Sequence, residues 1–181
     1  MSAATSPETF AAPMLRALER SDLPYVHALF NDPEVMRYWF EPAHATMADL
    51  DDGFDRRRGS DHERRFIVET AGRRVGLVEL MYIDPIHRNC EFQIIISPSE
   101  QGRGYASAAT RRAVDFAFRT LNLHKVWLLV DTANVAAVHV YEKAGFAVEG
   151  VLRQEFFADG VYRDATRMAI FADDWLAPGG E

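Results

Sequence analysis

The chain has 181 residues, of which 48% are hydrophobic and 12% aromatic, and this composition is sufficient for one domain with a packed core. The formal net charge of −7 argues against nucleic acid as a partner. The single cysteine, Cys90, excludes an internal disulfide, and no apolar run reaches membrane-spanning length. We therefore expect a soluble protein of the reducing cytoplasm with no membrane partner.

The two ends of the chain differ in composition from its middle. The first thirteen residues are mostly small and polar, and they lack the basic and apolar regions of a signal peptide. We expect residues 1–13 to form a disordered tail, residues 14–175 a single domain, and residues 176–181 a second tail. No internal repeat or interdomain linker interrupts the domain.

The first half of the chain predicts helices and strands from apolar periodicity and capping signals. Ser21-Asp22 caps a helix that Asn31-Asp32-Pro33 ends, and Ala71-Gly72 supplies the turn of a strand pair. The expected elements are a strand at 14–18, a helix at 21–30, a helix that contains Met47, Leu50 and Phe54, and strands at 65–69 and 75–83.

The second half of the chain alternates strands with helices. Its expected elements are strands at 91–97, 124–131 and 146–150, helices at 106–121 and 135–144, and a final hairpin. Asp159-Gly160 closes this hairpin, and the return strand contains residues 168–171.

A glycine-bearing turn, Gln101–Ala106, lies between a predicted strand and a predicted helix. Backbone N–H groups at the start of a helix have no intrahelical partner, and the helix dipole adds positive potential, so such a turn can bind a pyrophosphate. A Cβ atom at Gly102 or Gly104 would hold the phosphate away or forbid a positive φ. Ordinary strand-to-helix connections also use glycine, so the turn alone does not decide the function.

The spacing of this turn separates three phosphate-binding designs. The pattern GxxxxGK[ST] is absent, and a dinucleotide fingerprint would need glycine in place of Ser107. The third design, Q/R-x-x-G-x-G/A, matches Gln101, Gly104 and Ala106 and resembles the pyrophosphate loop of the GNAT acetyltransferases. Residues 134–146 resemble the second signature of that superfamily, a short helix closed by Gly145.

A narrower resemblance covers nearly the whole chain, from Met14 to Phe171. Six blocks are similar to the bacterial spermidine N-acetyltransferases: Met36–Glu41, Glu63–Phe66, Gly76–Leu80, Glu91–Ile96, Leu121–Lys125 and Glu155–Phe157. The resemblance implies a GNAT fold of the α/β (α+β) class, with a mixed central sheet of about seven strands flanked by about four helices. It also implies acetyl-CoA as cosubstrate, no required metal, a polyamine substrate and a homo-oligomer, a dodecamer in the family.

Tyr141 is the candidate general acid. Asn134, Val138 and Tyr141 share one face of the predicted helix, so the Tyr141 hydroxyl can point toward the ligand while Asn134 meets the pantetheine arm. A phenol with a pKa near about 10 can donate to a leaving thiolate with a pKa near about 8.5. The resemblance implies the same role, and the alternative is a tyrosine that only packs in the core.

Glu91 is the candidate residue that handles the amine. It shares a strand face with Gln93, Ile95 and Ser97, so its carboxylate can bind an ammonium group or accept its proton through water. These two roles stay open, and a structural salt bridge with Arg88 is the alternative.

The resemblance assigns the remaining site residues. For the cofactor it implies Ile94, Ile95, Ile96, Gln101, Gly102, Arg103, Gly104, Tyr105, Ala106, Ser107, Asn134, Tyr141 and Lys143. For the substrate it implies Met36, Glu41, Asp49, Glu91, Phe92 and Gln93. No metal site is expected, because the six histidines lack metal-ligand spacing.

The chain departs from the family at a second, regulatory polyamine site. Pro42, Ala45 and Tyr82 stand where carboxylates are expected, and Arg57 stands where a histidine is usual. Each missing carboxylate removes a charge-assisted contact of about 1.5 to 3 kcal/mol, so we expect weak polyamine regulation. The basic run Arg56–Arg58 is interpreted as a solvated helix end and not as a phosphate site.

These observations favour an N-acetyltransferase that transfers the acetyl group of acetyl-CoA to a primary amine of spermidine or spermine. One alternative is an acetyltransferase for another amine, such as a protein N-terminus. Another is a non-catalytic sensor of CoA or polyamine, which has no need of Tyr141.

Overall fold

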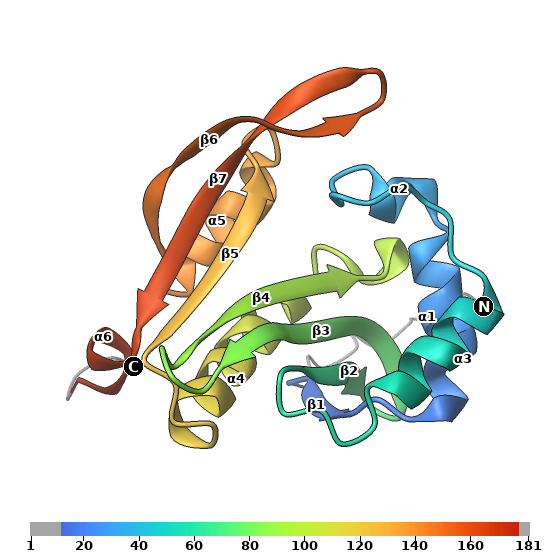
Figure 1. Ribbon diagram of the computed structural model, residues 1–181, viewed down its shortest axis with the longest axis horizontal. Coiled ribbons are helices and arrows are strands. Elements are labelled where there is room, and N and C mark those ends of the chain that lie inside the picture. Colours follow the sequence, from blue (N-terminus) through green and yellow to red (C-terminus); the bar gives the residue numbers. More distant parts are fainter. Residues whose placement is uncertain (1–11, 178–181) are drawn as a thin grey trace, which may run out of the picture.

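The computed structural model describes residues 12–177 and consists of one mixed β-sheet between two layers of helices (Figure 1). Residues 1–11 and 178–181, most of the two predicted tails, lie outside the described residues. The seven strands have the order β1-β2-β3-β4-β5-β7-β6. They are β1 Met14–Ala17, β2 Arg64–Thr70, β3 Arg73–Asp84, β4 Asn89–Ile96, β5 Lys125–Asp131, β6 Ala147–Ala158 and β7 Val161–Phe171.

Helices cover both faces of the sheet. They are α1 Leu23–Phe30, α2 Pro33–Met36, α3 Met47–Arg56, α4 Tyr105–Arg119, α5 Val135–Lys143 and α6 Ala172–Leu176, with two 3₁₀ turns at Arg20–Asp22 and Pro98–Glu100. The predicted fold class and strand number are confirmed. The predicted set of four helices lacked α2 and α6, which have four and five residues and are too short to show helical periodicity.

Each face of the sheet has its own apolar core. On one face, α1 and α3 pack on Ile67, Leu77 and Ile95, one residue from each of β2, β3 and β4. On the other face, α4 contributes a row of small buried residues that includes Ala109 and Ala113. Small side chains let the helix approach the sheet closely, so α4 is held firmly with its N-terminus at the end of β4.

β4 and β5 pair in parallel over only three residues, Asn89–Glu91 with Lys125–Trp127. Beyond this point β4 continues along β3 as far as Ile96, whereas β5 continues along β7 to Asp131. The two strands therefore diverge in the middle of the sheet, as Figure 1 shows. The divergence leaves one edge of β4 without a neighbouring strand.

The sixth strand is longer than predicted, because it runs to Ala158 and not to Gly150. Its register shifts between Leu152 and Phe156, and within this bulge Gln154 has a φ of 52°. The Gln154 N–H donates to the Asp164 carboxylate (2.8 Å), which holds the bulge in place. A bulge breaks the alternation of side chains on which strand prediction depends, and this explains the early end of the predicted strand.

A buried ion cluster around Asp22 stabilises the N-terminal part of the domain. The Asp22 carboxylate accepts two hydrogen bonds from Arg16, at 2.7 and 2.9 Å, and a third from Arg74 at 2.7 Å. It also accepts from the backbone N–H of Glu19. Asp22 is fully buried, and these contacts, those of Arg16 above all, hold the pKa of its carboxyl well below the usual value.

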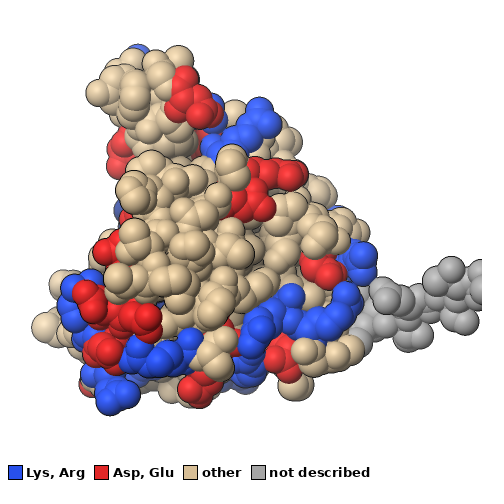
Figure 2. Space-filling view, turned by 90° about the vertical axis from the view of Figure 1, so that its right-hand side faces the viewer, with Lys and Arg blue, Asp and Glu red and all other residues tan. Residues whose placement is uncertain are grey.

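On the side of the molecule formed by α1 to α3, basic and acidic side chains are interspersed along the lower part, with a broad uncharged area above them (Figure 2). Arg20, for example, forms ion pairs with Asp51 and Asp55 of α3. Within residues 12–177, no helix is long and apolar enough to cross a membrane.

Candidate active site

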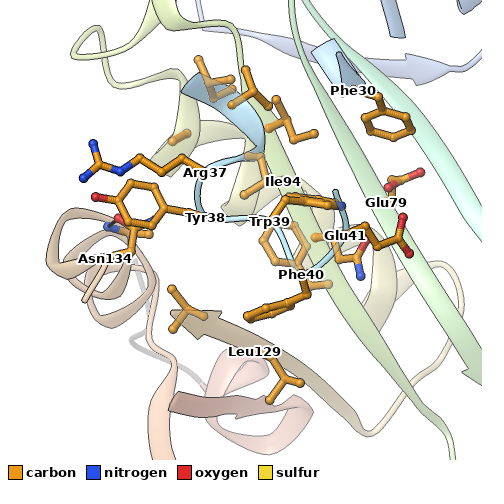
Figure 3. A pocket seen from close by; sticks show the side chains of 18 of the residues that line it. Phe30, Arg37, Tyr38, Trp39, Phe40, Glu41, Glu79, Ile94, Leu129 and Asn134 are labelled. Carbon is orange, nitrogen blue, oxygen red and sulfur yellow. Dashed lines mark hydrogen bonds between the residues drawn. The ribbon is translucent and has the colours of Figure 1, made fainter. Parts of the chain in front are cut away.

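A cleft of about 1190 Å³ lies where β4 and β5 diverge. Its walls come from β3 to β5, from the N-terminal ends of α4 and α5, and from the segment between α2 and α3. Figure 3 shows Tyr38, Trp39 and Glu41 of that segment around the cleft, with Leu129 of β5 and Asn134 beside it. The sheet, the two helix N-termini and this segment thus bring residues from most of the chain to one place.

The predicted phosphate loop lies at one end of this cleft. Gly102 and Gly104 have φ values of 74° and 80°, a backbone region that favours glycine, and Gly104 is the N-cap residue of α4. The Gln101 amide donates to the Ile96 carbonyl (3.2 Å), which fastens the loop to the end of β4. The first amide groups of the 15-residue helix α4 are therefore held at the cleft, as an anion cradle requires.

The predicted cofactor residues fall into two groups. Those that line the cleft are Ile94, Ile95, Ile96, Gln101, Gly102, Gly104, Tyr105, Ala106, Ser107, Asn134 and Tyr141. Arg103 and Lys143 are outside this lining. The Arg103 guanidinium lies 3.6 Å from the Glu100 carboxylate, and Lys143 is exposed in the last turn of α5, at the opposite end of the helix from Asn134.

β4 presents its free edge to the cleft. Ile94, Ile95 and Ile96 have no β5 residue opposite them, so backbone groups on this side of the strand are open to a ligand. The Ile96 carbonyl is the exception, because the Gln101 side chain occupies it. An extended molecule with amide groups can bind along this edge in place of the missing strand.

Asn134 is the N-cap residue of α5. Its side-chain oxygen accepts a hydrogen bond from the Ala137 N–H (3.2 Å), and its backbone N–H donates to the Asp131 carbonyl (2.8 Å). The capping bond uses only the oxygen of the side chain. The amide NH₂ is left to donate to a ligand in the cleft that Asn134 lines.

The ring of Tyr141 is fixed by two aromatic neighbours. Its centroid lies 6.2 Å from that of Phe92, at an interplanar angle of 87°, and 6.0 Å from that of Phe146. Burial raises the pKa of Tyr141 to about 12. Tyr141 lines the cleft, and no hydrogen bond joins its hydroxyl to another residue in the described part of the chain.

Glu91 is the last residue of β4 that pairs with β5, and it lies where the cleft begins. It is buried, and it accepts a hydrogen bond from Gln93 Nε2 (3.1 Å). Burial raises the pKa of the Glu91 carboxyl, although the Gln93 bond and the charge of Arg167 act in the opposite direction. The alternative salt bridge with Arg88 is not formed, because Arg88 donates to Asn122.

Most of the other predicted substrate residues line the cleft, but not all of them have a side chain that is free to bind a substrate. Glu41 and Gln93 line the cleft. Asp49 also lines it, but its carboxylate forms a capping box with Thr46 at the start of α3. Phe92 is 2% exposed and supports the Tyr141 ring, and Met36 is buried outside the cleft lining.

The sequence interpretation missed Glu79 and Arg65, which lie on adjacent strands at the floor of the cleft. It also placed Arg57 in a solvated run, and this was wrong for that residue. Arg57 is partly buried and lies 3.2 Å from Glu63, whereas Arg56 and Arg58 are exposed as expected. Glu79 is the charged residue within the apolar segment 75–80, and this charge was the signal that could have identified it.

The described residues contain neither an exposed thiol nor a cluster of metal ligands. Cys90 is fully buried, and burial raises the pKa of its thiol to about 12, so it packs as a small apolar residue as predicted. Across residues 12–177, no three His, Cys, Asp or Glu side chains are grouped to hold a metal ion.

The mixed sheet with diverging central strands, and the helix N-terminus at the end of one of them, define a GNAT-type acetyltransferase. Residues 14–147 match the family model described as an acetyltransferase (GNAT) domain, and the chain belongs to this family. The resemblance drawn from the sequence is thereby confirmed at the level of family and fold.

Two bacterial enzymes that share one name are similar to this chain in sequence. The spermidine N(1)-acetyltransferase of Escherichia coli K12 is 52% identical over 163 residues, which cover 90% of this chain and 88% of that protein. The Vibrio cholerae enzyme of the same name is 47% identical over 163 residues, which cover 90% of this chain and 94% of that protein.

Solved structures of the Vibrio cholerae enzyme are also similar. The crystal structure of spermidine N-acetyltransferase in complex with CoA and spermine has a TM-score of 0.89 and 46% identity, and covers 91% of this chain and 98% of that one. A structure described as dodecameric, in an intermediate state, has a TM-score of 0.83 and 45% identity, and covers 92% and 97% of the two chains.

Proposed function

We propose that this chain transfers the acetyl group of acetyl-CoA to a primary amine of a polyamine, spermidine or spermine, by direct attack in a ternary complex. The observation that carries this function is the cleft between β4 and β5, which has a helix N-terminus at one end and buried carboxylates on its floor. The named activity of the relatives, which cover 90% of the chain, supports it.

The chain has the groups to hold acetyl-CoA as a substrate. The pyrophosphate would bind at the amides of Gly102 to Ser107, which need no lysine to favour an anion. The amides of the pantetheine arm would bind along the free edge of β4, with Asn134 on the opposite side. Holding both reactants in line contributes up to about 7 to 11 kcal/mol to the rate.

The amine must lose a proton before it attacks the thioester. An alkylammonium group has a pKa near about 10.4, so the neutral form costs about 4.6 kcal/mol at pH 7. Glu91 binds the ammonium and accepts its proton, directly or through water. The raised pKa of the Glu91 carboxyl makes it a stronger base than an exposed glutamate.

The attack forms the C–N bond and breaks the C–S bond. The proton of the amine passes through Glu91 to solvent, and the sulfur is released as a thiolate that takes up one proton. With a pKa of about 12, Tyr141 stays protonated at every working pH and donates a hydrogen bond as charge develops on sulfur. Desolvation also raises the pKa of the leaving thiol, which favours proton transfer from Tyr141 to the sulfur. Tyr141 then regains a proton from solvent, so the net reaction releases CoA as the thiol.

A thiol-release assay with an amine panel tests this function. Spermidine and spermine are expected to release CoA and to gain one acetyl group, as detected by mass spectrometry. A peptide with a free N-terminus should react at a much lower rate. Faster acetylation of the peptide would replace the proposed substrate class, and binding of acetyl-CoA without thiol release with any amine would indicate a sensor.

A further inference from the structure

Glu79 lies beside the catalytic strand and has no role in the mechanism above. On β2 to β4, Arg65, Glu79 and Gln93 are cross-strand neighbours, so they share one face of the sheet. Ile67, Leu77 and Ile95 form the next row on this face and belong to the apolar core under α1 and α3. Glu79 therefore lies at the boundary where that core ends and the cleft begins.

The carboxylate of Glu79 is buried and incompletely satisfied. The residue is 3% exposed, and among the described residues its Oε1 atom accepts no hydrogen bond. Arg65 Nη1 is 3.0 Å from this oxygen but is not oriented to donate to it, and Arg65 Nε donates instead to Glu63 (3.0 Å). Because Arg65 is shared between Glu63 and Glu79, a further cation that donates to Glu79 Oε1 would stabilise this buried carboxylate.

The charges around Glu79 leave room for such a cation. Arg57 and Arg65 both contact Glu63. Burial raises the pKa of the Glu79 carboxyl, the charges of Arg65 and Arg57 lower it, and those of Glu63 and Glu41 raise it. Three carboxylates (Glu41, Glu63 and Glu79) therefore face two guanidinium groups. Figure 3 shows Glu41 and Glu79 together at the side of the cleft, close to Trp39 and Phe30.

We propose that Glu79 binds the second ammonium group of the acceptor, and that it thereby selects diamines and polyamines over monoamines. This inference rests on the proposed function, because it assumes that the reacting nitrogen lies at Glu91. Glu79 and Glu91 are diagonal neighbours on adjacent strands, with Cα atoms about 7 to 8 Å apart. Spermidine has three or four carbons between neighbouring ammonium groups, and we expect this spacing to reach both carboxylates.

The first experiment compares spermidine with n-butylamine, which lacks the second ammonium. Replacing Glu79 by Gln preserves size and removes the charge, so kcat/KM for spermidine should fall about 10- to 100-fold, mainly through KM. The value for n-butylamine should stay within twofold. Glu69→Gln is the matched control, because Glu69 is also a strand glutamate paired with an arginine but lies outside the cleft.

A second variant, Glu79→Asp, keeps the charge but moves it back by one carbon. It should retain the preference for diamines, and in a series of α,ω-diamines the optimum should shift to a longer chain. Equal losses for spermidine and n-butylamine in Glu79→Gln, or an unchanged chain-length optimum in Glu79→Asp, would overturn the role of Glu79. Absence of acetylation with every amine in the unmutated protein would instead overturn the proposed function.

Discussion

Tyr141 combines a fixed ring with a hydroxyl that no described protein group occupies. Phe92 and Phe146 hold the ring from two sides, and burial raises the pKa of the hydroxyl to about 12. A tyrosine that only filled the core would be served equally well by phenylalanine. The open hydroxyl at the cleft is therefore the feature that distinguishes a donor from a packing residue.

Tyr141→Phe keeps the ring and removes only the donor. We expect kcat to fall by about 10² to 10⁴, the usual effect of losing a general acid, with little change in acetyl-CoA affinity. Steady-state kinetics and calorimetry measure the two effects. Tyr25→Phe is the control, because Tyr25 bonds Ser97 (2.6 Å) away from the cleft, and an equal loss in both variants would make Tyr141 a packing residue.

The positions of Tyr141 and Glu91 at the cleft could be predicted from the sequence, and the position of Glu79 there could not. Tyr141 and Glu91 belong to segments whose spacing points to the chemistry. Glu79 stands in the apolar segment 75–80, whose pattern predicts a core strand. Only the structure shows that Glu79 lies where the apolar core ends and the cleft begins. The position of a residue relative to the end of a helical layer depends on tertiary packing, which periodicity does not contain.

At the scale of elements, the loop before α4 requires glycines, because its backbone adopts positive φ angles. A Cβ atom built at Gly102 would meet no protein atom within 4 Å, yet the φ of 74° strains any other residue. Gly59 has the same combination, with a φ of 77° and open space, but lies outside the cleft. The two glycines therefore form a matched pair.

We predict that Gly102→Ala and Gly59→Ala each destabilise the fold by about 1 to 2 kcal/mol. Only Gly102→Ala should weaken acetyl-CoA binding, by about 10- to 100-fold, because its methyl group stands between the phosphate and the backbone. Denaturant unfolding and calorimetry provide the two measurements. Equal acetyl-CoA affinity in the two variants would remove the loop from the binding site.

The Asp22 cluster predicts how stability depends on pH. The pKa of Asp22 is lowered in the folded state, so its contribution is present above the unfolded value of about 3.9 and is lost as the pH falls below it. Asp22→Asn should cost about 3 kcal/mol near pH 7, because it breaks a buried ion cluster. In urea unfolding, this difference should shrink below about pH 4, and a difference that is constant with pH would contradict the assignment.

The hairpin of β6 and β7 marks the limit of prediction for elements. Its turn at Asp159-Gly160 was predicted correctly, and residues 168–171, which were expected in the return strand, lie in β7. The length of β6 was not predicted, because the bulge at Gln154 is held by the side chain of Asp164, ten residues further along the chain. Long-range contacts of this kind leave no local pattern in the sequence.

At the scale of the whole molecule, the arginine at position 57 is the main reason to expect weak polyamine regulation. Its guanidinium lies 3.2 Å from Glu63, and the expected carboxylates are replaced by Pro42, Ala45 and an exposed Tyr82. A protein cation therefore occupies part of the region where the resemblance leads us to expect a regulatory polycation. The regulatory response should be weakened while the catalytic cleft is preserved.

We predict a near-hyperbolic dependence of velocity on spermidine concentration. Ala45→Glu with Tyr82→Glu should introduce cooperativity that declines with added salt, because the new contacts are between exposed charges. Initial-rate kinetics at two ionic strengths test this, together with sedimentation velocity to establish the oligomeric state of both proteins. Strong sigmoidal kinetics in the unmutated protein would show that the regulatory site is intact.

The free edge of β4 has a consequence for hydrogen exchange. Amide protons alternate in direction along a strand, so those of Phe92 to Ile96 that point to β3 are protected while the intervening ones face the cleft. Deuterium uptake in the ligand-free protein should therefore alternate between fast and slow along this segment. Acetyl-CoA acts in this view as a removable eighth strand, and its binding should make the whole segment exchange slowly.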